Sequence, residues 1–448
     1  MPTDRILPPD QNHGDLTEQL SDIALQPPAS RPERPALLTG LLLVGVLLLS
    51  VWVLFVQGPG IWGLDQATVW GFDIASYLWW IGLGNAGAVI SSLLLLLRHN
   101  WRNSLNRLAE SITLFSALVA GLFPILHLGR PWLAYWVFPL EFQDLGLWPQ
   151  FRSPLAWDAY AIFCYLGVVG LFWYVGLIPD LAALRDQARR RFWARVYGVL
   201  ALGWRGSGRH WTLWHRAYRT IAAISLPFVV TIHAGAALLL AGGPVPGWHS
   251  TIFPTLFMLG GTFAGFGLIA ALAVLLRRGL GLGNVLTVDH LDLLARLILA
   301  VSLAYIYCQL AEIWTLFYKS DRAELLVLRD RYVGQHALVT WVGWIGSIGA
   351  AQLLWFRAVR RSPSALLAIG LSIAASIYAI HYMLLVSSLT GGHFPAVWRP
   401  YSPTLSEWGL LAGSGGLFIA ILLLFLRMAP PISIFEVKQV LADERRTG

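Results

Sequence analysis

The residues best suited to chemistry lie where an apolar helix is predicted to end, in the stretch LFPILHLGRPWLAYW at 122–136. Pro124 interrupts the helix there, His127 follows, and Arg130 leads into a cluster of aromatic residues. Histidine titrates near neutral pH, and ionisable groups are costly to keep in a membrane. We therefore interpret this stretch as a site of proton chemistry at the lipid–water boundary.

Composition places the rest of the chain in a membrane. Hydrophobic residues make up 56% of the 448 positions and charged residues 12%, against about 25% charge in soluble proteins. The sequence predicts ten apolar spans, each long enough to cross about 30 Å of hydrocarbon. These spans lie near 37–56, 75–97, 108–128, 157–178, 218–240, 252–276, 293–318, 336–356, 364–389 and 409–426.

Cysteine content limits the redox centres that the chain itself could hold. Its two cysteines, Cys164 and Cys308, both lie within predicted spans. They cannot form a four-cysteine iron–sulfur set or a CxxCH haem site. We therefore expect no metal and no bound cofactor in this chain.

The basic residues predict the orientation. With the N-terminus cytoplasmic, 25 of the 32 Lys and Arg fall on the cytoplasmic side of the ten spans. Positively charged loops stay in the cytoplasm, so both termini are predicted inside a multi-pass protein. The net charge of +8 is thereby explained by topology, and no nucleic-acid partner is expected.

The predicted fold is all-α, with two parallel-oriented four-helix bundles at 70–240 and 252–389. The first helix of each bundle is expected to begin on the outer side of the membrane. The last helix of each carries one histidine at a similar depth, His233 in the first bundle and His381 in the second. Flanking helices are expected at 36–56 and 409–426. A proline-rich tail at 1–35 is predicted disordered, with at most a short amphipathic turn at 16–25, and 427–448 forms a second cytoplasmic tail. The arginine- and tryptophan-rich loop 179–219 is expected to hold an amphipathic interfacial helix.

The predicted orientation brings several polar residues to the outer end of the first bundle. They are Asp73, His127, Arg130, Asp158 and His233. Further ionisable residues lie deeper or in the second bundle. Of all these, Glu110, His233, Glu312 and His381 are candidates for a proton path; the alternative is that each makes an ordinary buried hydrogen bond between helices.

Several long motifs resemble one known family. They include WGFDIASYLWWIGLGNAG (70–87), LFPILHLGRPWLAYW (122–136), FRSPLAWD (151–158) and VPGWHSTIFP (245–254). Together they resemble the NrfD/polysulfide-reductase type of membrane subunit, most of all the first such subunit of alternative complex III. The resemblance extends from about Val69 to Trp408.

The resemblance implies a quinol-binding subunit of a bacterial plasma-membrane oxidoreductase, with menaquinol or a similar quinol as substrate. It also implies partners: a periplasmic-side iron–sulfur subunit, c-type cytochrome subunits that carry the haems, a second NrfD-type subunit and small membrane subunits. Electrons would pass to the iron–sulfur subunit outside the membrane. His127 and Asp158 match the positions linked to quinol binding in that family.

The chemistry of a quinol suits the outer cluster. Oxidation of a hydroquinone releases two protons with two electrons, so it needs a base and a second group that orients the base or carries protons away. We expect His127 to be the base, Asp158 to orient it or relay protons, and Asp73 to be a second relay. Arg130 either polarises a quinone carbonyl or pairs with a loop acid, Glu141 or Asp144. The aromatic lining would come from Phe123, Trp132, Tyr135, Trp136 and Trp157, although such residues also form ordinary interface belts.

Three other functions remain open from the residues. His233 and His381 could ligate a b-type haem between the bundles. The parallel repeat could belong to a secondary transporter, with the polar residues as an ion path. The chain could also be a structural anchor for soluble redox subunits. Asp158 itself has a purely structural alternative, as a helix cap after Ser153.

Overall fold

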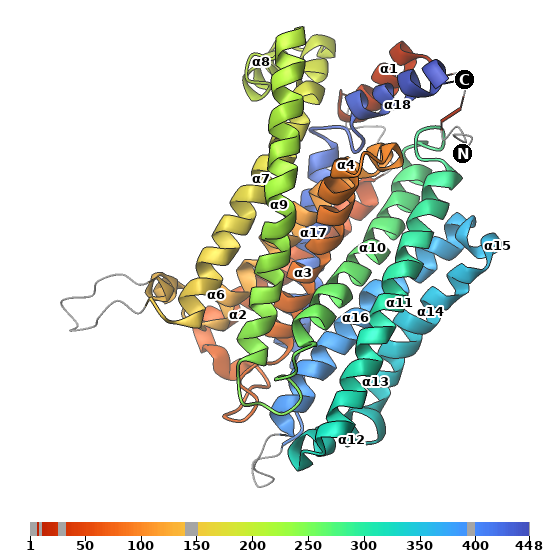
Figure 1. Cartoon of the computed structure of the whole chain (residues 1–448). Helices are drawn as coiled ribbons and strands as arrows, with labels where there is room; N and C mark the ends of the chain where they lie inside the picture. The colour runs from red at the N-terminus through yellow and green to blue at the C-terminus, as the bar shows by residue number, and fades with distance from the viewer. Residues whose placement is uncertain (1–6, 9–10, 26–32, 139–150, 392–398, 448) are drawn as a thin grey trace.

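The computed structural model describes residues 7–8, 11–25, 33–138, 151–391 and 399–447. Within these ranges the chain is helical and contains ten helical segments long and apolar enough to cross a membrane. This confirms the predicted polytopic α-helical fold. Figure 1 shows the long helices lying side by side, with both termini at one end of the bundle. We call that end the terminal end and the opposite end, which carries α6 and α12, the His127 end.

Each predicted span corresponds to one helical segment. The first bundle comprises α3 (Phe72–Ala88) continued by α4 (Leu94–Leu96), α5 (Asn106–Ala120) continued by α6 (Leu122–His127), α7 (Pro154–Gln187) and α9 (Gly208–Ala241). The second comprises α10 (Phe253–Gly279), α11 (Val288–Lys319), α13 (Ala337–Trp344) continued by α14 (Ala350–Gln352), and α16 (Pro363–Thr390). The flanking helices are α2 (Arg34–Gln57) and α17 (Leu405–Leu426).

The helices α7 and α9 run further toward the terminal end than the apolar spans predicted at 157–178 and 218–240. Hydropathy marks where apolar sequence ends, whereas arginine-rich sequence continues a helix readily. Between them lies α8 (Arg191–Leu200), a helix within the loop where an amphipathic helix was expected. At the His127 end, α12 (Arg322–Val333) connects α11 to α13.

Both ends of the chain form helices at the terminal end. The structure has a complete helix, α1 (His13–Leu25), where the sequence predicted at most a short turn in a disordered tail. Its residues Leu16, Leu20 and Ala24 are buried, and it packs against α18 (Ile434–Thr447) and α7. The apolar residues recur every fourth position, so one face of this short helix is covered by its neighbours.

The first helices of the two bundles meet at the centre of the molecule. The helices α3 and α10 pack on each other. In addition, α3 contacts α16, the last helix of the second bundle, and α10 contacts α9, the last helix of the first. Gly82 and Gly261 allow the close approach: a Cβ on Gly261 would lie 2.7 Å from the Cα of Gly82. Small residues permit such backbone contact between membrane helices. The flanking helices α2 and α17 likewise pack on each other.

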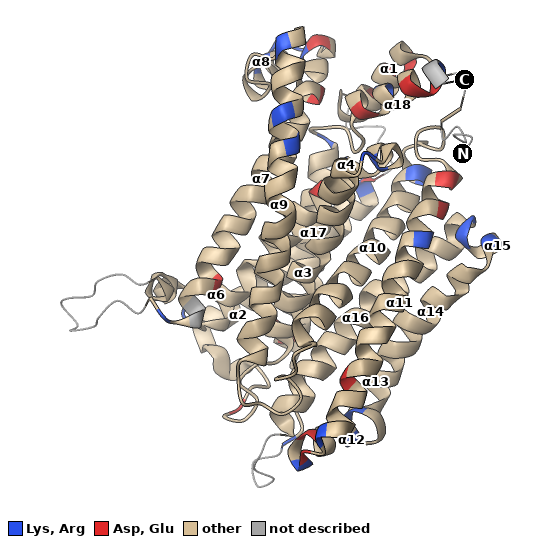
Figure 2. Cartoon of the chain, in the orientation of Figure 1, with Lys and Arg blue, Asp and Glu red and all other residues tan. Residues whose placement is uncertain are grey.

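Charged side chains gather at the two ends of the bundle. Figure 2 shows Lys and Arg concentrated at the terminal end, on α8, α9 and α15 (Arg357–Arg360). At the His127 end, α12 carries both signs of charge. Between the two ends the ribbon carries few charged residues (Figure 2), as expected of helices that cross a hydrocarbon layer.

A substitution at the central glycine contact tests this packing. Gly261→Val should lower the free energy of unfolding by roughly 1–3 kcal/mol, because the added methyl groups force α3 and α10 apart. Thermal unfolding of the purified chain in detergent measures the effect. Gly235→Ala on α9 is the matched control, since a Cβ there meets no atom within 4 Å. Equal melting temperatures for wild type and Gly261→Val would contradict the packing described.

Candidate functional site

The helix α6 ends at His127, and the imidazole contacts the first turn of α3. His127 Nδ1 lies 2.5 Å from Asp73 Oδ2. The Asp73 side chain is fully buried, whereas that of His127 is 25% exposed. Asp73 lies in the first turn of α3, at the positive end of the helix dipole.

This contact decides which nitrogen of His127 is available for chemistry. An ionised carboxylate only accepts hydrogen bonds. Nδ1 of His127 therefore carries the hydrogen and donates a hydrogen bond to Asp73. The lone pair of a neutral imidazole is then on Nε2, which has no hydrogen-bond partner among the described residues. The pair therefore presents a fixed basic nitrogen, in the manner of a histidine oriented by a carboxylate.

The chain turns sharply after His127. Gly129 has a φ of +67°, which favours glycine. A Cβ at this position would also lie 2.8 Å from the ring of Pro59. The glycine in LHLGRPW thus brings the loop after α6 against the segment that follows α2, and this packing fixes the end of α6.

Sequence reasoning missed the residues that support the pair. Trp62 is buried and stacks on His127, with ring centroids 6.4 Å apart and planes 18° apart. Glu407, at the start of α17, accepts hydrogen bonds from Tyr401 and from Gly63 N, the latter at 2.9 Å. The Tyr401 hydroxyl in turn accepts from Phe72 N, next to Asp73, at 2.9 Å. The one available signal was the Thr404–Glu407 capping box, which predicts a helix start but not these distant contacts.

Asp158 lies near this pair but does not contact His127. The Tyr77 hydroxyl, one helical turn after Asp73 on α3, donates to Asp158 Oδ1 at 3.0 Å. Ser153 occupies the N-cap position of α7, so Asp158 is not the cap of that helix. The structure therefore gives Asp73 the position next to the imidazole for which the sequence favoured Asp158. Tyr77 was not predicted, because a tyrosine in an apolar span carries no distinguishing signal.

The aromatic residues expected around the site differ in exposure. Trp132, Tyr135 and Trp136 lie on the 3-10 turn Pro131–Val137 and are exposed, at 59%, 47% and 46%. Trp157 is also exposed, whereas Phe123 is buried in the core. A surface of this kind beside a quarter-exposed imidazole is open to lipid.

Arg130 directly precedes the 3-10 turn Pro131–Val137 and is exposed. It makes no ion pair with any described residue. The two loop acids that the sequence offered as its partners, Glu141 and Asp144, lie outside the described residues.

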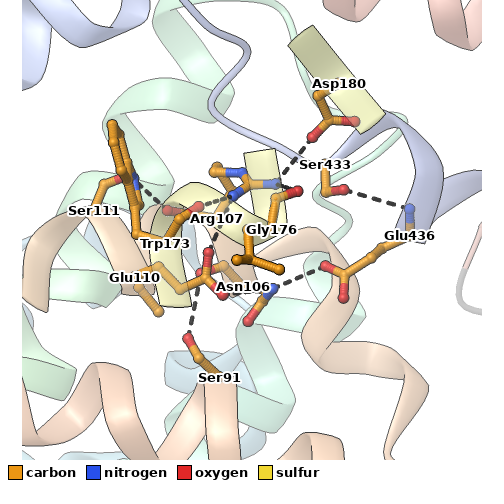
Figure 3. Close-up of polar contacts among 12 residues, drawn as sticks. Ser91, Asn106, Arg107, Glu110, Ser111, Trp173, Gly176, Asp180, Ser433 and Glu436 are labelled. Atoms are coloured by element: carbon orange, nitrogen blue, oxygen red, sulfur yellow. Dashed lines mark hydrogen bonds and ion pairs between the residues drawn. The ribbon is translucent and has the colours of Figure 1, made fainter. Parts of the chain in front are cut away.

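Glu110 belongs to a buried ionic network near the terminal end of the first bundle (Figure 3). Arg107 donates to Glu110 at 3.1 Å and to Asp180 at 3.0 Å, and the side chains of all three are 1% exposed. The Tyr218 hydroxyl lies 2.5 Å from the other oxygen of Glu110. A cavity of about 10 Å³ borders Glu110, Ser91 and Ser225, which is about the volume that one water requires.

The α18 helix completes this network. Glu436 binds Arg102 at 2.6 Å and accepts from Asn106 at 2.9 Å. Asp180 accepts from the backbone of Ile434 at 3.1 Å. Buried charges need such pairing, and here five helical segments supply it.

The histidines of α9 and α16 lie in different surroundings. His233 is fully buried, and its two ring nitrogens each lie 2.8 Å from a carbonyl oxygen, of Val229 and of Ile81. His381 packs against Phe257, and its Nδ1 has no partner among the described residues. Ligation of one haem iron by both rings would require His233 to give up a hydrogen bond.

The second bundle holds an acid–histidine pair that the sequence did not predict. His336 Nδ1 lies 2.5 Å from Asp330 Oδ2, at the His127 end, just before α13. Burial raises the pKa of Asp330, but the hydrogen bond and charge of His336 outweigh it and hold the pKa below its ordinary value. Glu312, the candidate in this bundle, instead accepts from the Ser250 hydroxyl at 2.5 Å. Within the described ranges no group of three or more His, Cys, Asp or Glu could hold a metal ion.

Comparison with known proteins identifies the class to which this fold and site belong. The family model described as "Polysulphide reductase, NrfD" matches residues 62–391, which include α3, α6, the His127–Asp73 pair and the His336–Asp330 pair. The chain belongs to this family.

Two curated relatives are similar to the chain. The C subunit of the selenate reductase of Mesobacillus selenatarsenatis is 22% identical over 408 residues, covering 87% of this chain and 91% of that protein. The C membrane subunit of a putative dimethyl sulfoxide reductase of Halobacterium salinarum is 26% identical over 247 residues, covering 52% of this chain and 51% of that protein.

The Asp330–His336 pair makes stability depend on pH. A folded pKa below the unfolded value means that the contribution is fully present above about pH 3.9 and is lost as the pH falls through the folded pKa. Asp330→Asn should therefore lower the unfolding free energy near pH 7 by about 1 kcal/mol, and the difference from wild type should shrink below about pH 4. Thermal unfolding in detergent across this pH range tests it, with exposed Asp186→Asn as control. A difference that persists unchanged at low pH would contradict the assignment.

Proposed function

We propose that this chain is the quinol-binding and quinol-oxidising membrane subunit of a multi-subunit oxidoreductase of the alternative complex III type. The observation that carries the proposal is the His127–Asp73 pair, in which Asp73 holds Nδ1 of a quarter-exposed imidazole and leaves Nε2 without a partner among the described residues. Family membership supports the coarser statement, since both relatives are named as subunits of reductases.

The pair suits the first step of quinol oxidation. A quinol hydroxyl donates its proton to Nε2 of His127, and Asp73 stabilises the imidazolium that forms. The second proton passes to Asp158, which Tyr77 connects to α3. An iron–sulfur cluster on a partner subunit would accept the two electrons one at a time. Exposed aromatic residues of the turn after α6 offer their faces to the quinol ring and its isoprenoid tail.

The same proposal assigns an orientation and an assembly. The basic terminal end is cytoplasmic by the positive-inside rule, so the His127 end faces the outside of a bacterial plasma membrane. The iron–sulfur subunit then docks outside, followed by c-type cytochrome subunits, with a second NrfD-type subunit and small membrane subunits alongside. The chain binds no cofactor of its own, and menaquinol is the substrate.

Loss of the base tests the site directly. His127→Ala should reduce quinol:acceptor turnover by about 10²–10⁴-fold, the usual contribution of a positioned general base. Activity is measured in the purified complex, and co-purification of the partner subunits shows that assembly is intact. His99→Ala, at an exposed histidine of the terminal end, is the matched control. Full turnover in an intact His127→Ala complex would refute the proposed site and leave the stretch as a docking surface.

We also propose that protons cross the membrane by way of Glu110 and the residues hydrogen-bonded to it. Glu110 binds Tyr218 and Arg107 and borders the small cavity, so it is placed to exchange a proton with water. Glu110→Gln should lower the number of protons moved per electron while quinol oxidation continues, because His127 is untouched. Proteoliposomes with an internal pH dye measure the ratio, and exposed Glu18→Gln serves as control. An unchanged ratio would show that Glu110 has a structural role.

A further inference from the structure

A basic cavity lies at the terminal end, away from the His127 pair. It has a volume of about 210 Å³ and lies between the turn after α4, the first turns of α9 and the start of α18. Its lining includes Arg98, Arg102 and Arg219 together with Trp214, Phe435 and Glu436. Three arginines thus share the cavity with one carboxylate.

That carboxylate, Glu436, already has partners for both of its oxygens. One oxygen of Glu436 binds Arg102 Nη2 at 2.6 Å, and the other accepts from Asn106 at 2.9 Å. Arg98 and Arg219 are exposed and form no ion pair with any described residue. The cavity therefore keeps a positive excess, which attracts an anion.

Arg102 provides a buried hydrogen-bond donor in the wall of the cavity. Its side chain is only 4% exposed, and its Nη1 is buried without a hydrogen-bond partner among the described residues. A buried N–H of a charged group left unsatisfied is costly, so a ligand oxygen at this place would be stabilised. Arginine binds phosphate oxygens well because its N–H groups match their geometry.

The depth of the cavity indicates where the anion comes from. Trp214 and Phe435 belong to an aromatic cluster at the terminal end, as expected of residues at the headgroup level. Leu96 and Leu97, which directly precede Arg98, are exposed at 40% and 58%. The backbone then turns into the left-handed region at Arg98, with a φ of +59° that non-glycine residues seldom adopt. An apolar surface thus leads directly to a group of arginines.

We propose that this cavity binds the phosphate group of an anionic phospholipid, with Arg102 Nη1 as the buried donor and Arg98 and Arg219 as the outer cations. The acyl chains lie along the apolar surface of α4. The site is independent of quinol oxidation, because none of these residues belongs to the His127 pair.

Lipid retention by the purified full-length chain tests the proposal. Native mass spectrometry after titration with phosphatidylglycerol, and separately with phosphatidylcholine, measures binding of each lipid. Arg98→Gln/Arg219→Gln should lower phosphatidylglycerol occupancy by about tenfold and leave phosphatidylcholine unchanged, since each cation near an anionic headgroup contributes to binding. Arg209→Gln/Arg216→Gln, at two arginines that are also exposed on α9 but lie outside the cavity, is the charge-matched control.

Two further experiments distinguish a lipid headgroup from a soluble anion as the occupant of the cavity. Displacement of the lipid by inorganic phosphate alone would support the phosphate site with a soluble anion as its occupant; its failure to compete supports the lipid. Gln439→Glu adds a negative charge to the cavity wall without removing any cation and should weaken phosphatidylglycerol binding too. Equal phosphatidylglycerol retention by wild type, the double variant and Gln439→Glu would overturn the proposal.

Discussion

The hydrocarbon layer penalises polar groups that find no partner within the protein, and this constraint organises the whole bundle. The helix α3 shows it most clearly. Its first turn pairs Asp73 with His127, its second directs Tyr77 to Asp158, and a backbone carbonyl further along lies against the ring of His233. The same helix makes the close glycine contact with α10. One element therefore carries the polar contacts of three neighbouring helices and the central contact between the bundles.

Ionisable side chains are paired differently at the two ends of the bundle. At the His127 end, acid–histidine pairs leave a titratable group partly exposed, both at His127 and at His336. At the terminal end, Arg107 is enclosed with Glu110 and Asp180 and is shielded from solvent. Exposed, oriented imidazoles suit proton exchange with a ligand, whereas an enclosed network holds charge in a fixed place until a water or a partner side chain changes it. Carboxylates thus serve two different purposes, paired with histidine at one end and with arginine at the other.

The spans, their order and the stretch at His127 could be predicted, because hydropathy, glycine and histidine leave local signals in the sequence. The partners of His127 could not. Asp73 lies 54 residues away and Asp158 was an equally suitable carboxylate, so only the packing of α6 on α3 decides between them. Glu407 supports the same region through a hydrogen bond that spans 344 positions of the chain, and no local pattern announces such a contact. Asp330 sits in a polar segment, where an acid carries no distinguishing signal.

The place of α18 in the Glu110 network has a consequence for how the protein is made. Arg102, Asn106 and Asp180 belong to the first bundle, yet their partners Glu436 and Ile434 are translated more than 250 positions later. The first bundle is therefore synthesised with part of its buried charge unpaired, and it reaches its final state only once α18 has been made. A chain that ends before α18 therefore keeps an open ionic site in its first bundle.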